Sequence, residues 1–415
     1  MVAKISDVRD KTPAANATVP GVGPLAGVEI AEFSAFVAAP LAGMTLAQLG
    51  ASVTRIDPPG GGPDQFRMPV DDDGRSLYWA GLNKGKQSVE LNLKDQEDQR
   101  VAQALVERAG IVLTNLPDRG WLAWSNLKRM REDLICIRLV GQPDGAPAVD
   151  FTVNPSSGFP CATGPSDEPI NHVLPAWDVA AGLYLCTGLL AALQHRERTG
   201  EGQEVRLSLT DVMLATVANL GYVADVQING HVRPPLGNEI YGTFGKDFVT
   251  ADDRRVMVAA LTDRQWKSLT AATGLEHELT LAGQAMGQEV AHDRGRWHSR
   301  RALEAVLEPW FAARPLIGIV QAFRENGVLF GVYQDFGQLV GEDPWCSEDN
   351  PIFARVQHPG TGSYLTPSSP LAFSVSPGSP PLPAPRLGQD TARIRELARE
   401  QEMSADGPAL RPHEA

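Results

Sequence analysis

Short apolar runs alternate with helical patterns along the first third of the chain. The runs predict strands over five segments, namely Val28–Phe33, Val53–Ile56, Ser88–Leu93, Ile111–Thr114 and Leu134–Leu139. Helical periodicity lies between them, over Pro40–Leu49, Gln96–Ala109 and Asn126–Arg131. Strands and helices that alternate at this spacing indicate a parallel sheet covered on both faces, which is an α/β fold.

The pattern changes after the first third of the chain. A stretch over 150–175 rich in Pro, Gly and Ser predicts a loop. The elements predicted after it are helices over Asp178–Arg196, Asp263–Thr273, Arg301–Ala312 and Thr391–Glu400, a strand over Glu204–Leu209, and a hairpin over Phe248–Ala260. The sequence pattern changes around Arg233-Pro234-Pro235, where we place a boundary between two domains.

We therefore expect two domains with flanking segments. The expected parts are a mobile extension (1–23), a large domain (24–229), a smaller α+β domain (230–345), a return segment to the large domain (346–402) and a tail (403–415). A chain of 415 residues with 43% apolar residues is long enough to bury the cores that this division requires.

Composition excludes several classes of protein. The net charge is −13 and no long basic stretch occurs, so we expect no nucleic-acid partner. We find no run of about 18 apolar residues and no secretory signal in the first 23, which predicts no membrane span. The four cysteines are scattered, which argues against a zinc site or disulfides and indicates a reducing, cytoplasmic setting. The histidines show no metal-ligand spacing, so we expect no metal.

Asp178 is the first candidate for chemistry. It opens a helix that is apolar nearly all round, which predicts a buried helix. From spacing alone, the more frequent role of such an aspartate is that of an N-cap. A carboxylate at a helix start is also favoured in its ionised form, and an ionised carboxylate can act as a covalent nucleophile toward an acyl group.

Two turns are candidates for ligand binding. The turn Ser34–Pro40 lacks the G-x-G-x-x-G pattern of dinucleotide sites, but its small residues, Val37 and Ala38 among them, could face an acyl or pantetheine group. The turn Asn83-Lys84-Gly85-Lys86 offers two cations and backbone amides to phosphates. The alternative for this second turn is a solvated surface loop.

Three stretches resemble the family III coenzyme A transferases. They are 24–56, the segment Leu82–Leu91, and Asp178–Gln203 with its Asp-x-x-x-Gly-x-Tyr start and Arg-Thr-Gly-Glu-Gly-Gln end. The resemblance covers roughly 24–395. It implies a Rossmann-like large domain, a smaller domain and an interlocked homodimer. It also implies that Asp178 forms a mixed anhydride and then a CoA thioester, with CoA as part of the substrate and no permanently bound cofactor.

Positions at which this chain departs from the family pattern help to choose among the activities found in the family. The intermolecular formyl-CoA-type members carry Gln where this chain has Val37, together with a tetraglycine loop that we do not find. The racemases carry Gly-His-Asp where this chain has Ala148-Val149-Asp150, and racemisation needs a base on each face of the α-carbon. The resemblance favours a member that moves CoA within one dicarboxylic acid. An intermolecular transferase, a racemase and a non-catalytic CoA-binding protein remain the alternatives.

The remaining site residues follow from what this chemistry requires. Backbone N–H donors for the oxyanion are expected at Val37–Ala39 or at the start of the Asp178 helix. The expected CoA contacts are Val37, Ala38, Arg55, Asn83, Lys84, Lys86 and, as a weaker candidate, Arg119. The idle carboxylate of the substrate is assigned to His172, Tyr241 and Lys246, although the first could instead cap its loop and the other two could be ordinary hairpin residues.

Overall fold

The computed structural model describes residues 23–164 and 168–405. The predicted extension up to residue 22 and the predicted tail from residue 406 lie outside the described residues. The chain forms two compact units. The first consists of residues up to Asp150, Pro175–Val212 and the segment from Ser347, and the second consists of Phe151–Leu174 and Met213–Cys346.

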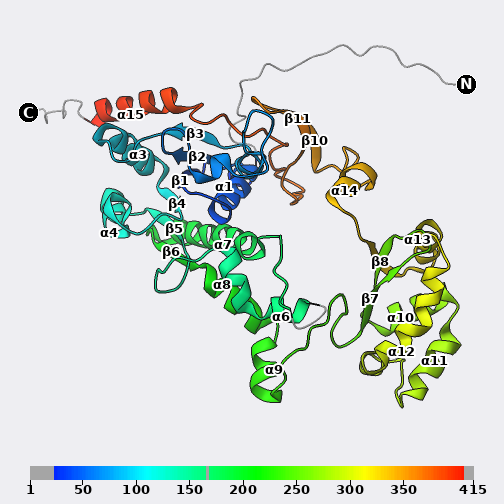
Figure 1. The fold of residues 1–415 in the computed structure, drawn as a ribbon. Helices are drawn as coiled ribbons and strands as arrows, with labels where there is room; N and C mark the ends of the chain where they lie inside the picture. The colour runs from blue at the N-terminus through cyan, green and yellow to red at the C-terminus, as the bar shows by residue number, and fades with distance from the viewer. Residues whose placement is uncertain (1–22, 165–167, 406–415) are drawn as a thin grey trace, which may run out of the picture. The chain divides into compact units, whose positions relative to one another are not determined.

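A six-stranded parallel sheet forms the centre of the first unit (Figure 1). Its strands are β1 (Glu29–Phe33), β2 (Ser52–Asp57), β3 (Gln87–Glu90), β4 (Ile111–Thr114), β5 (Ile135–Val140) and β6 (Glu204–Ser208). They lie in the order β3-β2-β1-β4-β5-β6, so the chain reverses direction across the sheet between β1 and β4. This confirms the predicted α/β fold and its Rossmann-like sheet. In such sheets ligands bind beyond the carboxyl ends of the strands at the reversal point.

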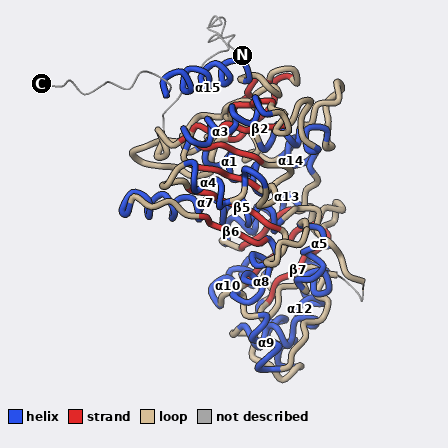
Figure 2. The backbone as a smooth tube through the Cα atoms, turned by 90° about the vertical axis from the view of Figure 1, so that its left-hand side faces the viewer, coloured by secondary structure: helices blue, strands red, loops and turns tan. Residues whose placement is uncertain are grey.

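Helices cover both faces of this sheet (Figure 2). The elements are α1 (Ala38–Gln48), η1 (Pro63–Phe66), α2 (Leu77–Leu82), α3 (Gln96–Ala109), η2 (Gly120–Leu122), α4 (Trp124–Met130), α7 (Ala176–Thr199) and α15 (Thr391–Ala405). The hairpin β10 (Phe353–His358) and β11 (Gly362–Pro367) completes the unit.

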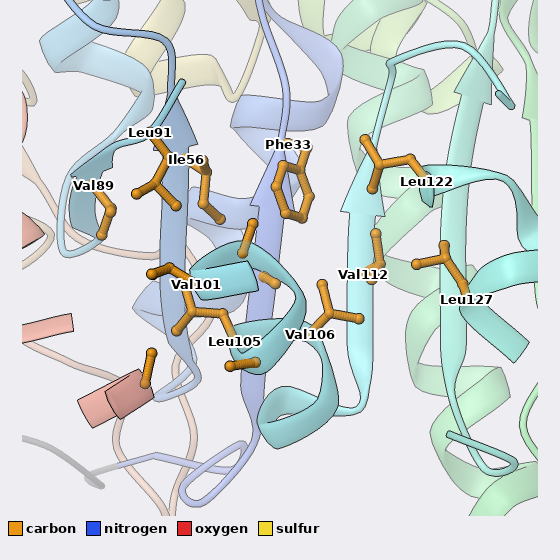
Figure 3. Packing of buried hydrophobic residues seen from close by; sticks show 14 of the residues in the cluster. Phe33, Ile56, Val89, Leu91, Val101, Leu105, Val106, Val112, Leu122 and Leu127 are labelled. Carbon is orange, nitrogen blue, oxygen red and sulfur yellow. The ribbon is translucent and has the colours of Figure 1, made fainter. Parts of the chain in front are cut away.

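Side chains from β1 show how the two faces differ. Successive strand residues point to opposite sides. Ala31 and Phe33 therefore enter the apolar cluster beneath α3 (Figure 3), while Glu32 points toward α1 and lies against Gly43. The apolar face forms the main core of the unit, and the other face carries a buried charge between the sheet and α1.

Helix α7 is apolar but only partly buried. One face, including Ala181, Leu185 and Leu189, packs into the first unit, whereas Leu183 and Tyr184 are exposed. The prediction of a helix buried all round is therefore wrong for its outer face. By length and composition α7 could also cross a membrane, contrary to our expectation that the chain has no such stretch. Helix α7 packs against α1, β5 and β6, as a core helix of a globular unit does.

The second unit is built around a three-stranded antiparallel sheet, with strands β7 (Phe244–Val249), β8 (Arg255–Ala260) and β9 (Leu329–Val332). The helical elements of this unit are α5 (Asp150–Val153), η3 (Asn154–Ser157), α6 (Phe159–Thr163), α8 (Leu209–Asn219), α9 (Tyr222–Asn229), α10 (Asp263–Thr273), α11 (Glu276–Ala285), α12 (Asp293–Ala312), α13 (Leu316–Asn326) and α14 (Phe336–Glu342), of which α5 and α8 start in the first unit. Helix α10 has its predicted bounds, and the predicted hairpin starts four residues early at Phe244. Helices α8 and α9, bent by 57°, would pass the same membrane test if taken together.

Candidate active site

Asp178 lies in the first turn of α7, two residues after the helix begins. The N-cap position is Pro175, whose side chain offers no hydrogen-bond acceptor. The capping acceptor is instead Asp150, whose Oδ2 accepts hydrogen bonds from the backbone N of Trp177 at 2.7 Å and of Asp178 at 3.1 Å. The interpretation of Asp178 as an N-cap is therefore wrong. Its carboxylate is not needed to cap the helix and can take part in chemistry.

The environment of Asp178 makes its carboxylate more basic than usual. The pKa of Asp178 is raised to about 6, mainly by burial and also by the negative charge of Asp150, while the positive charge of Arg67 opposes the rise. At pH 7 the carboxylate is still mainly ionised. A carboxylate with a raised pKa is a stronger nucleophile than an exposed one, and such shifts are typical of functional sites.

The turn after β1 is held in place by two side chains from other loops. Asn115, which follows β4, accepts a hydrogen bond from the backbone N of Ala35 at 3.1 Å and donates one to its carbonyl at 2.8 Å. Asp64 accepts a hydrogen bond from the backbone N of Phe36 at 3.2 Å. Phe36 has a φ of 69°, which is unfavourable for a residue with a side chain. The surrounding hydrogen bonds therefore keep the turn in a strained shape at the reversal point of the sheet.

This turn leads directly into α1 and leaves backbone donors available. Val37, Ala38 and Ala39 are buried, and within residues 23–164 and 168–405 no group accepts a hydrogen bond from their N–H groups. Helix α7 approaches this point closely, because a Cβ on Gly182 would lie 2.8 Å from the Ala38 carbonyl oxygen. The start of α1 therefore lies beside the first turns of α7, near Asp178. Unpaired N–H groups at such a place can stabilise an oxyanion.

Three of the residues expected to contact CoA belong to a buried polar network. Arg55 is fully buried and pairs with Asp57 at 2.9 Å and Asp64 at 2.8 Å. Lys86 donates to Glu32 at 2.8 Å, and Arg55 and Lys86 both donate to the Asn83 side chain. Their side chains therefore have no exposed donor for a phosphate in this structure. They connect β1, β2 and the strained turn instead.

The other expected CoA contacts lie in different surroundings. Lys84 is also buried, makes no ion pair among the described residues, and has its pKa lowered to about 8 by burial. Arg119 lies on the exposed loop after β4, with no carboxylate within ion-pair distance in the described part of the chain. These two cations remain available for an anionic ligand.

The three residues expected to bind the idle carboxylate belong to the second unit. Lys246 forms an ion pair with Glu304, so its charge is locally compensated. Tyr241 packs against Trp297, with ring centroids 4.9 Å apart, and also lies under the guanidinium of Arg233. The backbone N of His172 donates to the Asn171 side chain at 3.0 Å.

Several residues of the site were not predicted from the sequence. Asp64 lies in the short helix η1, Asn115 and Arg67 lie in loops, and their partners are 9 to 111 positions away along the chain. In the sequence, Asp150 was considered only as the last residue of Ala148-Val149-Asp150, the triplet that lacks the histidine of the racemases. Asp150 follows a segment that contains Gly and Pro. Nothing in the sequence near it indicates that it caps a helix whose Trp177 is 27 residues further along the chain.

The Rossmann-like sheet, the half-buried carboxylate in the first turn of a core helix and the adjacent backbone donors form a candidate site for acyl chemistry. No group of three or more His, Cys, Asp or Glu side chains that could hold a metal lies within the described residues. Residues 25–391 match the family model of CoA-transferase family III, and the chain belongs to this family.

Three known proteins show what this chain is similar to within and beyond the family model. The chain is 50% identical over 379 residues to a 2-methylfumaryl-CoA isomerase of Chloroflexus aurantiacus, covering 90% of this chain and 93% of that protein. It is 28% identical to a succinyl-CoA:mesaconate CoA-transferase of Haloarcula marismortui, covering 91% and 97%. A crystal structure of a CAIB/BAIF family protein from Brucella suis shares the fold, with a TM-score of 0.77, 24% identity, and coverage of 91% and 100%. The resemblance inferred from the sequence motifs is confirmed.

Proposed function

We propose that this enzyme moves CoA between the two carboxyl groups of one dicarboxylic acid, converting 2-methylfumaryl-CoA (mesaconyl-C1-CoA) to 3-methylfumaryl-CoA (mesaconyl-C4-CoA). The substrate assignment rests on the 50% identity to a protein named for this isomerisation. The observation that carries the chemistry is the position of Asp178, a half-buried carboxylate in the first turn of α7 beside the free backbone donors of α1.

The reaction proceeds in four displacement steps. The Asp178 carboxylate attacks the C1 thioester carbonyl, forming an anhydride and releasing CoA thiolate. The thiolate attacks the aspartyl carbonyl, which leaves an Asp178–CoA thioester and free mesaconate. The acid turns within the pocket, and its C4 carboxylate attacks this thioester to give the second anhydride and the thiolate. Attack of the thiolate on the C4 carbonyl completes the product and restores the Asp178 carboxylate.

Each displacement develops negative charge on a carbonyl oxygen. The N–H groups of Val37, Ala38 and Ala39 are suitable donors, because they are buried and no described group accepts from them. Lys84 and Arg119 are our candidates for the CoA phosphates. His172, Tyr241 and Lys246 remain candidates for contacts with the acyl group.

The test is chromatographic separation of the two CoA esters after incubation of either one with the purified enzyme. Labelled free mesaconate is added to the same reaction. We expect conversion to an equilibrium mixture with little label in the esters, and Asp178→Ala to abolish it. Substantial incorporation of label would instead indicate an intermolecular transferase, and deuterium exchange at the α-carbon of a saturated 2-methylacyl-CoA would indicate a racemase. Mass spectrometry of enzyme trapped with hydroxylamine should locate the modification on Asp178.

We also propose that the enzyme is a cytoplasmic homodimer, as the family resemblance implies. Exposed apolar side chains support a partner surface, among them Leu183 and Tyr184 on α7 and Leu220 and Ile228 near α9. Light scattering after size exclusion should give twice the mass of the chain. A monomer at micromolar concentration would contradict this assignment.

A further inference from the structure

Residues 36–40, which we call the donor segment, carry the N–H groups assigned to the oxyanion. The side chains of this segment are apolar and offer no hydrogen bonds. Phe36 has a φ of 69°, a conformation that persists only where its surroundings enforce it. Pro40 has no N–H, so the free donors are those of residues 37–39. The direction of these donors depends on the main chain, and hydrogen bonds that fix the main chain must come from other segments.

Lys86 holds the helical end of the donor segment. Its side chain has no exposed surface, and its ammonium group donates at 2.8 Å to three acceptors, which are the Pro40 carbonyl oxygen, Glu32 Oε1 and Asn83 Oδ1. An ammonium group has three hydrogens, so all of them are used within the protein. Lys86 therefore acts on the first turn of α1 through the Pro40 carbonyl.

Arg55 holds the other end of the donor segment through Asp64. Its Nη2 donates to Asp64 Oδ2 at 2.8 Å, and the same oxygen accepts from the backbone N of Phe36 at 3.2 Å. Its Nη1 donates at 3.1 Å to Asn83 Oδ1, the oxygen that also accepts from Lys86. A continuous path of hydrogen bonds therefore joins the two ends of the donor segment.

This path is buried along its whole length. Arg55, Asp64, Asn83 and Lys86 are each at most 3% exposed. Charged groups buried in pairs contribute little net stability, because the loss of hydration offsets their attraction. Hydrogen bonds that involve charged groups are short and directional, however, and the dry surroundings strengthen them. The path therefore fixes the geometry of the main chain more than it stabilises the fold.

We propose that Lys86, together with Arg55, is a positioning residue of the acyl transfer. The hydrogen bonds of these two cations to the ends of the donor segment keep its N–H groups directed at the carbonyl oxygen of the acyl group. The inference rests on the proposed function, because these N–H groups are the donors assigned to its oxyanion. The oxygen carries most of its charge in the transition state, so loss of alignment lowers kcat more than it weakens binding.

The first test is Lys86→Met, which keeps the length of the side chain and removes the ammonium group. We expect kcat for the interconversion of the two mesaconyl esters to fall about a hundredfold, because donors that are displaced lose most of their effect on the transition state. KM should change by less than about threefold. A rise in KM with kcat unchanged would contradict the inference, because it would show a role in binding alone.

A second variant separates positioning from folding. Lys86→Met leaves the Glu32 carboxylate buried without its cation, and Glu32 Oε2 already has no hydrogen-bond partner among the described residues. The single variant should therefore be less stable. Adding Glu32→Gln removes that buried charge and should restore stability in urea unfolding, but the Pro40 carbonyl still lacks its donor, so kcat should stay low. Recovery of kcat together with stability would overturn the inference, because Lys86 would then only support the fold.

The polarisation of the substrate carbonyl can also be measured directly. Mesaconyl-CoA that is isotope-labelled at the thioester carbonyl carbon is bound at saturation to Asp178→Asn enzyme, which cannot form the anhydride. Infrared difference spectra then give the stretching frequency of this carbonyl. We expect the frequency to lie below its value in water, and Lys86→Met in the same background to shift it most of the way back. Equal frequencies with and without Lys86 would refute the proposed role.

Arg296→Met is the matched control. Arg296 is another fully buried cation that donates to main-chain carbonyls, those of Val290 and Ala291, but it belongs to the second unit. Its loss should lower stability and leave kcat and the carbonyl frequency unchanged, whereas a fall in kcat as large as that of Lys86→Met would count against the inference. The proposed function is judged on wild type: failure to interconvert the two esters would refute the isomerase, while the carbonyl frequency, which needs no turnover, still decides the role of Lys86.

Discussion

Replacing Asp178, the proposed nucleophile, should stabilise the protein at neutral and alkaline pH. Burial is the main reason that the pKa of Asp178 rises from its ordinary 3.8 to about 6, and Asp150 adds to the effect. Above pH 6 the folded enzyme therefore carries an ionised carboxylate in surroundings that disfavour its charge. This lowers the free energy of unfolding by up to about 3 kcal/mol. Asp178→Asn keeps the shape of the side chain and removes this cost, so we expect a gain of about 1–3 kcal/mol at pH 8.

The dependence on pH identifies the cause. Well below pH 3.8 the carboxyl group is protonated in both the folded and the unfolded chain, so the variant and wild type should have equal stability. As pH rises from about 4 to about 6, the unfolded chain ionises at this position first, and wild type loses stability relative to the variant. Urea unfolding at pH 4, 6 and 8, followed by tryptophan fluorescence, measures this difference in the free energy of unfolding.

A control separates this local effect from a general change in net charge. Asp72→Asn removes one negative charge at an exposed position and should change the free energy of unfolding by less than about 0.5 kcal/mol at each pH. A gain in Asp178→Asn that is the same at pH 4 and pH 8 would refute the reasoning. So would a loss of stability at pH 8, because it would show that the ionised Asp178 contributes favourable contacts to the fold.

Three further variants test the parts that position the nucleophile. Asp150→Asn retains a capping oxygen but removes a charge that raises the pKa of Asp178, so the acid limb of the pH–rate profile should move to lower pH; an unchanged profile would contradict the coupling. Asp64→Ala removes the acceptor for the Phe36 N–H and should lower kcat at least tenfold with a smaller effect on KM, as steady-state kinetics with mesaconyl-CoA would show. Gly182→Ala should cost about 1–3 kcal/mol in urea unfolding, because the added methyl group would press on the Ala38 carbonyl; a neutral result would mean that α1 and α7 can separate freely.

The sheet could be predicted from the sequence because its signal is local. A strand buried on both sides reads as a short apolar run, and the five runs of the first third of the chain correspond to β1 to β5 within a few residues. Helix α3 has its predicted bounds because a capping Asp95 and a terminal Gly110 mark its ends. Helix α9 was not predicted, because its apolar residues are exposed and do not form the stripe that faces a core.

The site was only partly predictable, for a different physical reason. Asp178 is a candidate from the sequence because a motif surrounds it. The surroundings that set its properties come from distant loops, and the roles of Asp150, Arg67 and Asn115 depend on contacts made only in the folded chain. The same holds for Arg55 and Lys86, whose sequence neighbours do not reveal that they are buried among acids. Spacing along the chain indicates a candidate reacting group but does not reveal the charges that set its pKa.

The carboxylate that caps α7 has a consequence for the direction of attack. Because Asp150 accepts the hydrogen bonds of Trp177 and Asp178, these two N–H groups of α7 cannot also polarise an acyl group. The proposed mechanism therefore assigns the polarising donors to the buried N–H groups at the start of α1, so that the carbonyl oxygen faces this helix while either ester is formed or broken.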